Sequence, residues 1–211
     1  VKTFIDKCRI HFGNGGAQKE GAAYTGCFVR QPGMPTDAWL NDLDYSELRL
    51  VHTPELDFYS KPGVFGWDRI DRGSAFLLQQ LPACLARLPA PPRSLLDPGC
   101  GYGYLTLATR DLRMERLVAT DNNAAALLAM TRNMAHHGMA VDVLADDAAA
   151  SVKGQFDLVL CNPPFHQGFA VDGGLTDKFL ANTSRLLSER GAALFVVNTF
   201  VGLEQKARAY F

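Results

Sequence analysis

The sequence has little net charge and no long apolar run. Its 211 residues carry 21 basic and 22 acidic side chains, which gives a net charge of −1. This balance excludes a broadly basic surface, so a nucleic-acid partner would need a local cationic patch or a separate segment. No apolar run approaches the roughly 20 residues of a membrane helix, and the first residues, V-K-T-F-I-D-K, lack the apolar core of a signal peptide. We therefore expect a cytoplasmic protein without a membrane partner.

Paired cysteine motifs are also absent. The five cysteines have no C-x-x-C pair and no regular spacing; they are Cys8, Cys27, Cys84, Cys100 and Cys161. His136 and His137 are adjacent near the end of a predicted helix, so their side chains point in different directions. The pattern predicts reduced thiols, solvated histidines and no metal site.

The first part of the chain shows no strong periodic pattern and no repeat. G-N-G-G-A (13–17) and Q-P-G-M-P (31–35) are typical of loops, and 37–57 is rich in Asp and Glu. Short strands are expected near 7–12, 24–30 and 48–51. We interpret residues 1–58 as a linker or the remnant of an N-terminal domain.

Residues 59–211 have a different pattern. An apolar helical segment at 74–81 is interrupted at Pro82 and then resumes. Further on, strands and helices alternate: strands are predicted at 93–97, 115–121, 141–145, 156–162 and 192–198, and helices at 104–112, 124–138 and 175–187. This alternation predicts an α/β fold with a doubly wound, mostly parallel, Rossmann-like sheet. Several strands are continuous apolar runs, as expected when helices cover both faces.

A glycine-rich loop joins the first of these strands to a helix. It reads D-P-G-C-G-Y-G (97–103) and lies where a doubly wound fold places its ligand crevice. Gly99 and Gly101 permit a tight turn and a close backbone approach to a ligand, although a purely structural turn would use them too. A dinucleotide fingerprint needs a third glycine at 104, where the sequence has Tyr104, which disfavours a nicotinamide-dependent dehydrogenase. Asp97 would repel a pyrophosphate but suits a ligand that carries an ammonium and a sulfonium.

Acidic residues follow the next two strands. Asp121 ends its strand 22 residues after Gly99, where a carboxylate accepts both hydroxyls of a ribose. Its neighbour Asn122 belongs to the same predicted site. Asp146 and Asp147 follow the third strand, within reach of an adenine amino group. We favour Asp147 for this role and expect Asp146 to be solvated.

The fourth strand ends in L-C-N-P-P-F-H-Q-G (160–168). A residue before proline is pushed out of the helical region, and the second proline fixes φ again. The result is a stiff corner that presents the amide of Asn162 and the ring of Phe165. The alternative is a rigid loop whose Phe165 packs into the core.

In this order, these elements resemble the class I S-adenosylmethionine-dependent methyltransferases over roughly 60–211. D-P-G-C-G-Y-G is similar to their first motif, Asp121 to their ribose-binding acid, and N-P-P-F to their fourth motif. The resemblance implies S-adenosyl-L-methionine as the cofactor. The implied cofactor site comprises Asp71, Asp97, Gly99, Gly101, Asp121, Asn122, Asp147 and Asn162.

In that family an N-P-P-F corner implies methylation of a nitrogen conjugated to a planar group. The side-chain oxygen of Asn162 and the carbonyl of Pro163 would accept the two N–H groups of the amine and align its lone pair with the methyl group. Phe165 would stack on a base flipped out of its helix. Asn162, Pro163 and Phe165 are therefore the predicted catalytic residues.

The residues around N-P-P and before the first strand of the predicted sheet narrow the choice among methyltransferase families. N-P-P-F-H is similar to the ribosomal RNA guanine-N2 methyltransferases, whereas N-P-P-Y is typical of adenine-N6 and glutamine-N5 enzymes. P-G-V-F-G-W-D-R-I-D-R-G-S-A-F-L-L (62–78) resembles a segment in the C-terminal domain of the ribosomal RNA small-subunit methyltransferase C family. That family usually has serine in place of Gly66. The resemblance implies that Asp71 touches the methionine end of the cofactor; alternatively, Asp71 caps the helix that follows.

The small subunit is thus the favoured source of substrate, but large-subunit guanine-N2 enzymes share N-P-P-F-H-Q. Members of the small-subunit family carry a second, degenerate N-terminal domain, and the fold normally ends in an antiparallel hairpin; we expect this chain to lack both.

The implied partner is ribosomal RNA or an assembled ribosomal subunit, bound by a monomeric enzyme. Lys61, Arg69 and Arg72 are candidate RNA contacts. A methyltransferase-like module that binds RNA without catalysis is the non-enzymatic alternative.

Overall fold

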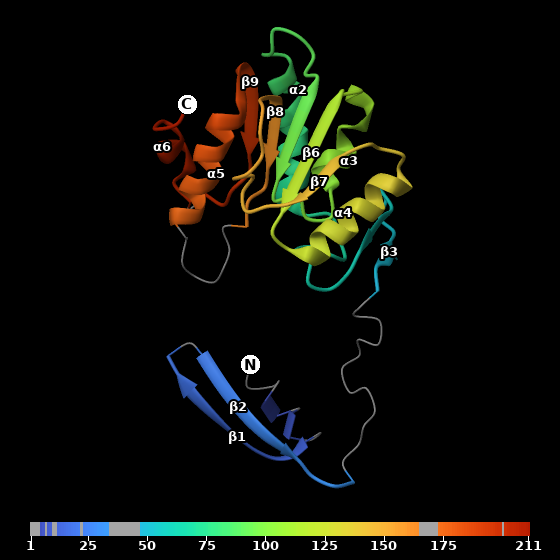
Figure 1. Cartoon of the computed structure of the whole chain (residues 1–211), viewed down its shortest axis with the longest axis vertical. Coiled ribbons are helices and arrows are strands. Elements are labelled where there is room, and N and C mark those ends of the chain that lie inside the picture. The colour runs from blue at the N-terminus through green and yellow to red at the C-terminus, as the bar shows by residue number, and fades with distance from the viewer. Residues whose placement is uncertain are drawn as a thin grey trace. The chain divides into compact units, whose positions relative to one another are not determined.

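The computed structural model describes residues 5–6, 8–9, 12–21, 23–33, 47–164, 173–199 and 201–211. The chain divides into two units, Val1–Tyr45 and Ser46–Phe211 (Figure 1). Residues 46–58, which the sequence pattern assigned to the N-terminal part, group with the larger unit.

The N-terminal unit contains an antiparallel hairpin. Strand β1 (Gly13–Glu20) pairs with β2 (Ala23–Arg30). The strand expected near 24–30 is confirmed, but the loop expected at 13–17 is wrong. The aromatic ring of Phe28 explains why, because it lies over the glycines: a Cβ on Gly15 would come within 2.1 Å of that ring. The strand expected near 7–12 is also wrong for its described part, since Cys8 and Arg9 are helical.

The larger unit begins with a short antiparallel pair, β3 (Arg49–Val51) and β4 (Phe58–Ser60). Phe58 of β4 stacks on Tyr102 of the glycine loop, with ring centroids 4.0 Å apart. Helix α2 (Arg72–Leu85) follows and runs through Pro82, so the predicted interruption is wrong. Burial of Leu77 and Leu81 against the sheet offsets the one backbone hydrogen bond that proline removes.

The central sheet has five parallel strands in the order β7-β6-β5-β8-β9 (Figure 1). Their bounds are β5 (Ser94–Pro98), β6 (Arg116–Asp121), β7 (Asp142–Ala145), β8 (Phe156–Cys161) and β9 (Leu187–Phe195). The connecting helices are α3 (Tyr104–Ala108), the 3-10 turn η1 (Arg110–Leu112), α4 (Ala124–His136), α5 (Gly173–Leu186) and α6 (Leu203–Ala207). The predicted doubly wound sheet is confirmed.

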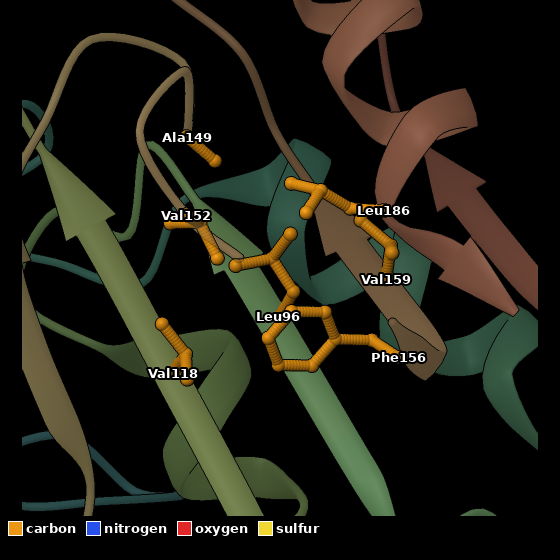
Figure 2. Close-up of a cluster of buried hydrophobic side chains, with 7 residues drawn as sticks. All are labelled: Leu96, Val118, Ala149, Val152, Phe156, Val159 and Leu186. Carbon is orange, nitrogen blue, oxygen red and sulfur yellow. The ribbon is translucent and has the colours of Figure 1, made fainter. Parts of the chain in front are cut away.

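Helices cover both faces of this sheet, and β5 shows how the sequence encodes this. Successive side chains of a strand point to opposite faces. Leu95 packs with Leu77 and Leu81 of α2 and with Leu105 of α3. Its neighbour Leu96 packs in a second cluster, on the side of α5. The members of that cluster are Leu96, Val118, Ala149, Val152, Phe156, Val159 and Leu186 (Figure 2).

The sheet order reverses at β5, because β6 pairs on one side of it and β8 on the other. In open parallel sheets, ligands bind at such a point, outside the carboxyl ends of the strands. Pro98, Asp121 and Cys161 end β5, β6 and β8, so the glycine loop and the N-P-P corner lie at the same edge of the sheet. Among the described residues no helix is long and apolar enough to cross a membrane.

Candidate functional site

The glycine loop is anchored to the neighbouring strand. The backbone N–H groups of Gly99 and Cys100 donate to the carbonyl of Thr120, at 2.7 and 3.0 Å. Gly101 has a left-handed φ of 55°, and a Cβ there would meet nothing within 4 Å. The loop therefore leaves open space beside Gly101 that a ligand can enter.

Asp121 ties this loop to the start of α4. Its Oδ2 accepts a hydrogen bond from the backbone N–H of Gly101 at 2.9 Å, and its Oδ1 accepts from that of Asn123 at 2.8 Å. Each carboxylate oxygen has a second lone pair. The half-buried side chain can therefore accept two further hydrogen bonds from a ligand, as a ribose requires. Asn122 is exposed beside it.

Asn123 is a residue of this region that the sequence pattern did not single out. Its side-chain oxygen caps α4 by accepting from the backbone N–H of Ala125, at 2.9 Å, and its Nδ2 donates to the carbonyl of Gly63, at 2.8 Å. Asparagine before an alanine-rich helix is a typical N-cap, and this signal could have identified it. Asn123 thus joins the segment before α2 to the predicted ribose site.

Asp97 is completely buried at the end of β5. Its Oδ2 accepts from the hydroxyl of Thr106 at 2.7 Å, and its Oδ1 has no hydrogen-bond partner. The pKa of Asp97 is raised to about 7, because burial, together with the nearby charge of Asp121, outweighs the hydrogen bond from Thr106, which lowers the pKa. An unpartnered buried carboxylate oxygen favours a cationic partner.

The N-P-P corner follows β8, and the thiol of Cys161 donates to the carbonyl of Pro98 at 3.3 Å. Asn162 is half-buried, and its Nδ2 donates to Oδ2 of Asp71 and to Oγ of Ser74, both at 2.8 Å. Pro163 is buried. Phe165 lies outside the described residues. The side chain of Asn162 therefore keeps its oxygen for a ligand.

Asp71 is the N-cap of α2, where its Oδ2 accepts from the backbone N–H of Ser74 at 2.8 Å. The capping interpretation is confirmed. The same oxygen also binds Asn162, a contact that the sequence did not indicate. Contact of Asp71 with a cofactor stays a prediction.

The loop after β7 is held by helix α5. The carboxylate of Asp147 pairs with Lys178, while Asp146 accepts from the backbone N–H and hydroxyl of Ser151, at 2.9 and 2.7 Å. Partial burial opposes ionisation of Asp146, but these hydrogen bonds outweigh it and lower its pKa. Asp146 is therefore bound within its loop rather than only solvated. The role of Asp147 at an adenine stays a prediction.

Two of the candidate RNA contacts, Arg69 and Arg72, are exposed. The backbone carbonyl of Arg69 accepts from the hydroxyl of Tyr102 at 3.2 Å, which fixes this segment beside the glycine loop. Phe65, in the same segment, is 66% exposed. Lys61 is half-buried. Among the residues that the structure describes, no group of three or more histidines, cysteines or acids is arranged to hold a metal ion.

Comparison with known proteins identifies the family of the chain. Residues 55–211 match the methyltransferase small domain family.

This chain belongs to that family.

Similar curated proteins include the ribosomal RNA small subunit methyltransferases C of Hahella chejuensis and Aeromonas hydrophila. Each is 35% identical to this methyltransferase small domain chain, over 156 and 159 residues, or 74% of its length. The alignments cover only 44% of either relative, so the chain spans less than half the length of these proteins.

A solved structure with the same fold is that of the T. thermophilus 16S rRNA N2 G1207 methyltransferase (RsmC) in complex with AdoMet and guanosine. The two structures align with a TM-score of 0.76 and 23% identity, over all of this chain and 56% of that one. At this identity the match shows the shared fold.

Proposed function

We propose that this methyltransferase domain transfers a methyl group from S-adenosyl-L-methionine to the exocyclic N2 of a guanine in ribosomal RNA, with small-subunit RNA as the favoured substrate. The observation that carries the proposal is the amide of Asn162, whose NH₂ group is fully used by Asp71 and Ser74 and whose oxygen remains to accept an amine hydrogen. The names of the relatives support the small subunit, and the solved structure of similar fold, that of a 16S rRNA N2 G1207 methyltransferase, supports guanine N2.

The residues at the carboxyl edge of the sheet fit the cofactor. Asp121 offers two oxygens already oriented by backbone N–H groups, Gly101 leaves room for a ligand, and Asp97 has an unpartnered oxygen for an ammonium group. Asp147 and Asn122 would complete the adenosine side. When bound, the cofactor supplies a methyl group on a positively charged sulfur, which is already a good leaving group.

The protein contributes orientation to the reaction. An exocyclic amine conjugated to a purine is a poor nucleophile because its lone pair is delocalised. The Asn162 oxygen and the Pro163 carbonyl would accept its two N–H groups, so that the lone pair points at the methyl group. Alignment of this kind supplies much of the rate of a bimolecular step. A deprotonated general base is not required before the transfer.

The test is transfer of tritiated methyl groups to ribosomal subunits from an unmethylated strain, followed by nucleoside analysis. We expect N2-methylguanine in small-subunit RNA, and a comparison of naked RNA with assembled subunits would identify the form recognised. Label in large-subunit RNA would show that the substrate is the RNA of the large subunit. N6-methyladenine or methylglutamine would contradict the guanine assignment, and binding of RNA without any transfer would favour the non-enzymatic module.

Replacing Asp121 with alanine should weaken the binding of S-adenosylmethionine and S-adenosylhomocysteine at least tenfold. Tenfold corresponds to about 1.4 kcal/mol, a modest value for charge-assisted hydrogen bonds to ribose hydroxyls. Isothermal calorimetry measures the affinity, with circular dichroism as the check on folding. If the folded variant binds the cofactor with unchanged affinity, Asp121 is not part of the cofactor site.

Cofactor affinity should rise with pH through neutrality. The folded-state pKa of Asp97 is raised to about 7, so the free protein still holds this proton at pH 6 and must release it to bind an ammonium group. We expect about a fivefold gain in affinity between pH 6 and 7.5, which is smaller than the roughly eightfold rise in ionised Asp97 because the α-amino group of the cofactor is already partly deprotonated at pH 7.5. Asp97→Asn should flatten this dependence, and an unchanged pH profile in that variant would contradict the assignment.

A further inference from the structure

The amide of Asn162 has a fixed orientation. Both of its Nδ2 hydrogen bonds run to acceptors on a segment far away in the sequence, Asp71 and Ser74. We propose that Asp71 and Ser74 are positioning residues, which hold the Asn162 oxygen toward the amine of the substrate. This inference rests on the proposed function and assigns to Asp71 a task other than contact with the cofactor.

The chemistry of the two partners determines which end of the amide faces them. An ionised carboxylate can only accept hydrogen bonds, so Asp71 must face the NH₂ group of Asn162 and not its oxygen. The NH₂ group has two hydrogens, and the 2.8 Å bonds to Asp71 and Ser74 use both. Rotating the amide by half a turn would place its oxygen against the carboxylate and leave both hydrogens without these partners.

The two acceptors are themselves held in place. Oδ2 of Asp71 is fixed by the backbone N–H of Ser74, because it caps α2. Ser74 is buried, and the same helix packs on the sheet through Leu77 and Leu81. Gly73 lies close to the pair, since a Cβ there would come within 3.0 Å of Oδ2 of Asp71. The helix start is thus a rigid support for the end of β8.

The consequence is selectivity for hydrogen-bond donors. With both hydrogens of Asn162 used, the side chain can only accept from the substrate, as an amino group requires. Without Asp71 or Ser74, the amide could present its own hydrogens to the amine, and two donors would then face each other. The flipped fraction of molecules would be unable to align the amine, which lowers kcat without removing the cofactor site.

Variants of Asp71 separate this role from helix capping. Asp71→Ser keeps a good N-cap, but its shorter side chain does not reach Asn162. Asp71→Asn keeps both the cap and an oxygen that can accept from Asn162. We expect kcat to fall about tenfold or more in Asp71→Ser and to stay within about threefold of wild type in Asp71→Asn, because small misplacements of a reacting group cost large rate factors.

Ser74→Ala tests the second acceptor, since it leaves the backbone cap intact. Its matched control is Ser94→Ala, which also removes a buried serine hydroxyl. The hydroxyl of Ser94 donates to Asp157 at the start of β8, which is the opposite end of the strand from Asn162. We expect Ser74→Ala to lower kcat about tenfold and Ser94→Ala to leave it within about twofold. The Kd for S-adenosylhomocysteine and the KM for RNA should change by less than about twofold in Ser74→Ala and in Ser94→Ala.

A second readout does not depend on activity. In ¹⁵N-labelled protein the side-chain amide signals of Asn162, assigned by their loss in Asn162→Ala, should exchange slowly with solvent in the wild type and faster in Asp71→Ser and Ser74→Ala. Wild-type protein that forms no N2-methylguanine would refute the proposed function, while protected amide hydrogens would still support their orientation. Methyl transfer with unchanged kcat in Asp71→Ser and Ser74→Ala would refute the positioning role and leave the proposed function standing.

Discussion

Asn162→Ala should fold, bind the cofactor normally and lose methyl transfer by at least about 100-fold. The loss follows from removal of one of two acceptors that orient the amine, and preorganised hydrogen-bonding groups at a reacting centre are worth this much. Folding should survive because the two prolines restrict the corner and because Val196 donates its backbone N–H to the carbonyl of Cys161, at 3.1 Å. The measurements are single-turnover methyl transfer and calorimetry with S-adenosylhomocysteine.

Asn162→Asp is the informative companion because it is nearly isosteric. Its carboxylate cannot donate to Asp71 and would lie against another negative charge, so we expect a similar loss of transfer and a lower stability as well. An Asn162→Ala protein as active as wild type would refute the orientation mechanism. Loss of cofactor binding together with activity would instead indicate that the corner shapes the cofactor crevice.

The sheet and the positions of the glycine loop and of the acidic residues could be predicted because they depend on local patterns. Three such patterns are apolar strands that alternate with helices, a glycine loop after the first strand, and acidic residues after the next two strands. Each can be recognised from residues that are neighbours in the sequence. The strand expected at 115–121 is observed as Arg116–Asp121, and the one at 156–162 as Phe156–Cys161. The burial of Leu95 and Leu96 in β5 follows from their apolar side chains in the same way.

The errors come from contacts between distant residues. The glycines at 13–17 have the composition of a loop, but the ring of Phe28, on the paired strand, lies over Gly15. Asp71 has two local interpretations, a helix cap or a ligand contact, and neither includes Asn162, which lies 91 residues away. Lys178 likewise reaches Asp147 from a helix whose docking the sequence does not specify. Local patterns predicted the polar groups of the candidate site, whereas contacts in the folded chain determine which of their atoms remain available.

Gly103→Ala should cause the largest loss of stability in the glycine loop. Gly103 has a φ of 95°, where side chains are strained, and a Cβ there would lie 2.2 Å from the sulfur of Met130 and 3.0 Å from Cε of Met134. Backbone strain and overpacking together should lower the free energy of unfolding by about 2–5 kcal/mol. For a chain of this size the melting temperature should fall by about 5–15 °C, measured by calorimetry.

Gly138→Ala is the matched control, because Gly138 also has a positive φ, of 66°, but a Cβ there would meet nothing within 4 Å. It should show the backbone strain alone, about 1 kcal/mol. The difference between the two variants then measures the packing of the loop against α4. Shortening Met130 to alanine should relieve the steric clash with the new Cβ. Met130→Ala should therefore lower the free energy of unfolding less in the Gly103→Ala protein than in the wild type. Strictly additive losses would show that Met130 does not restrict this position and that the strain is in the backbone.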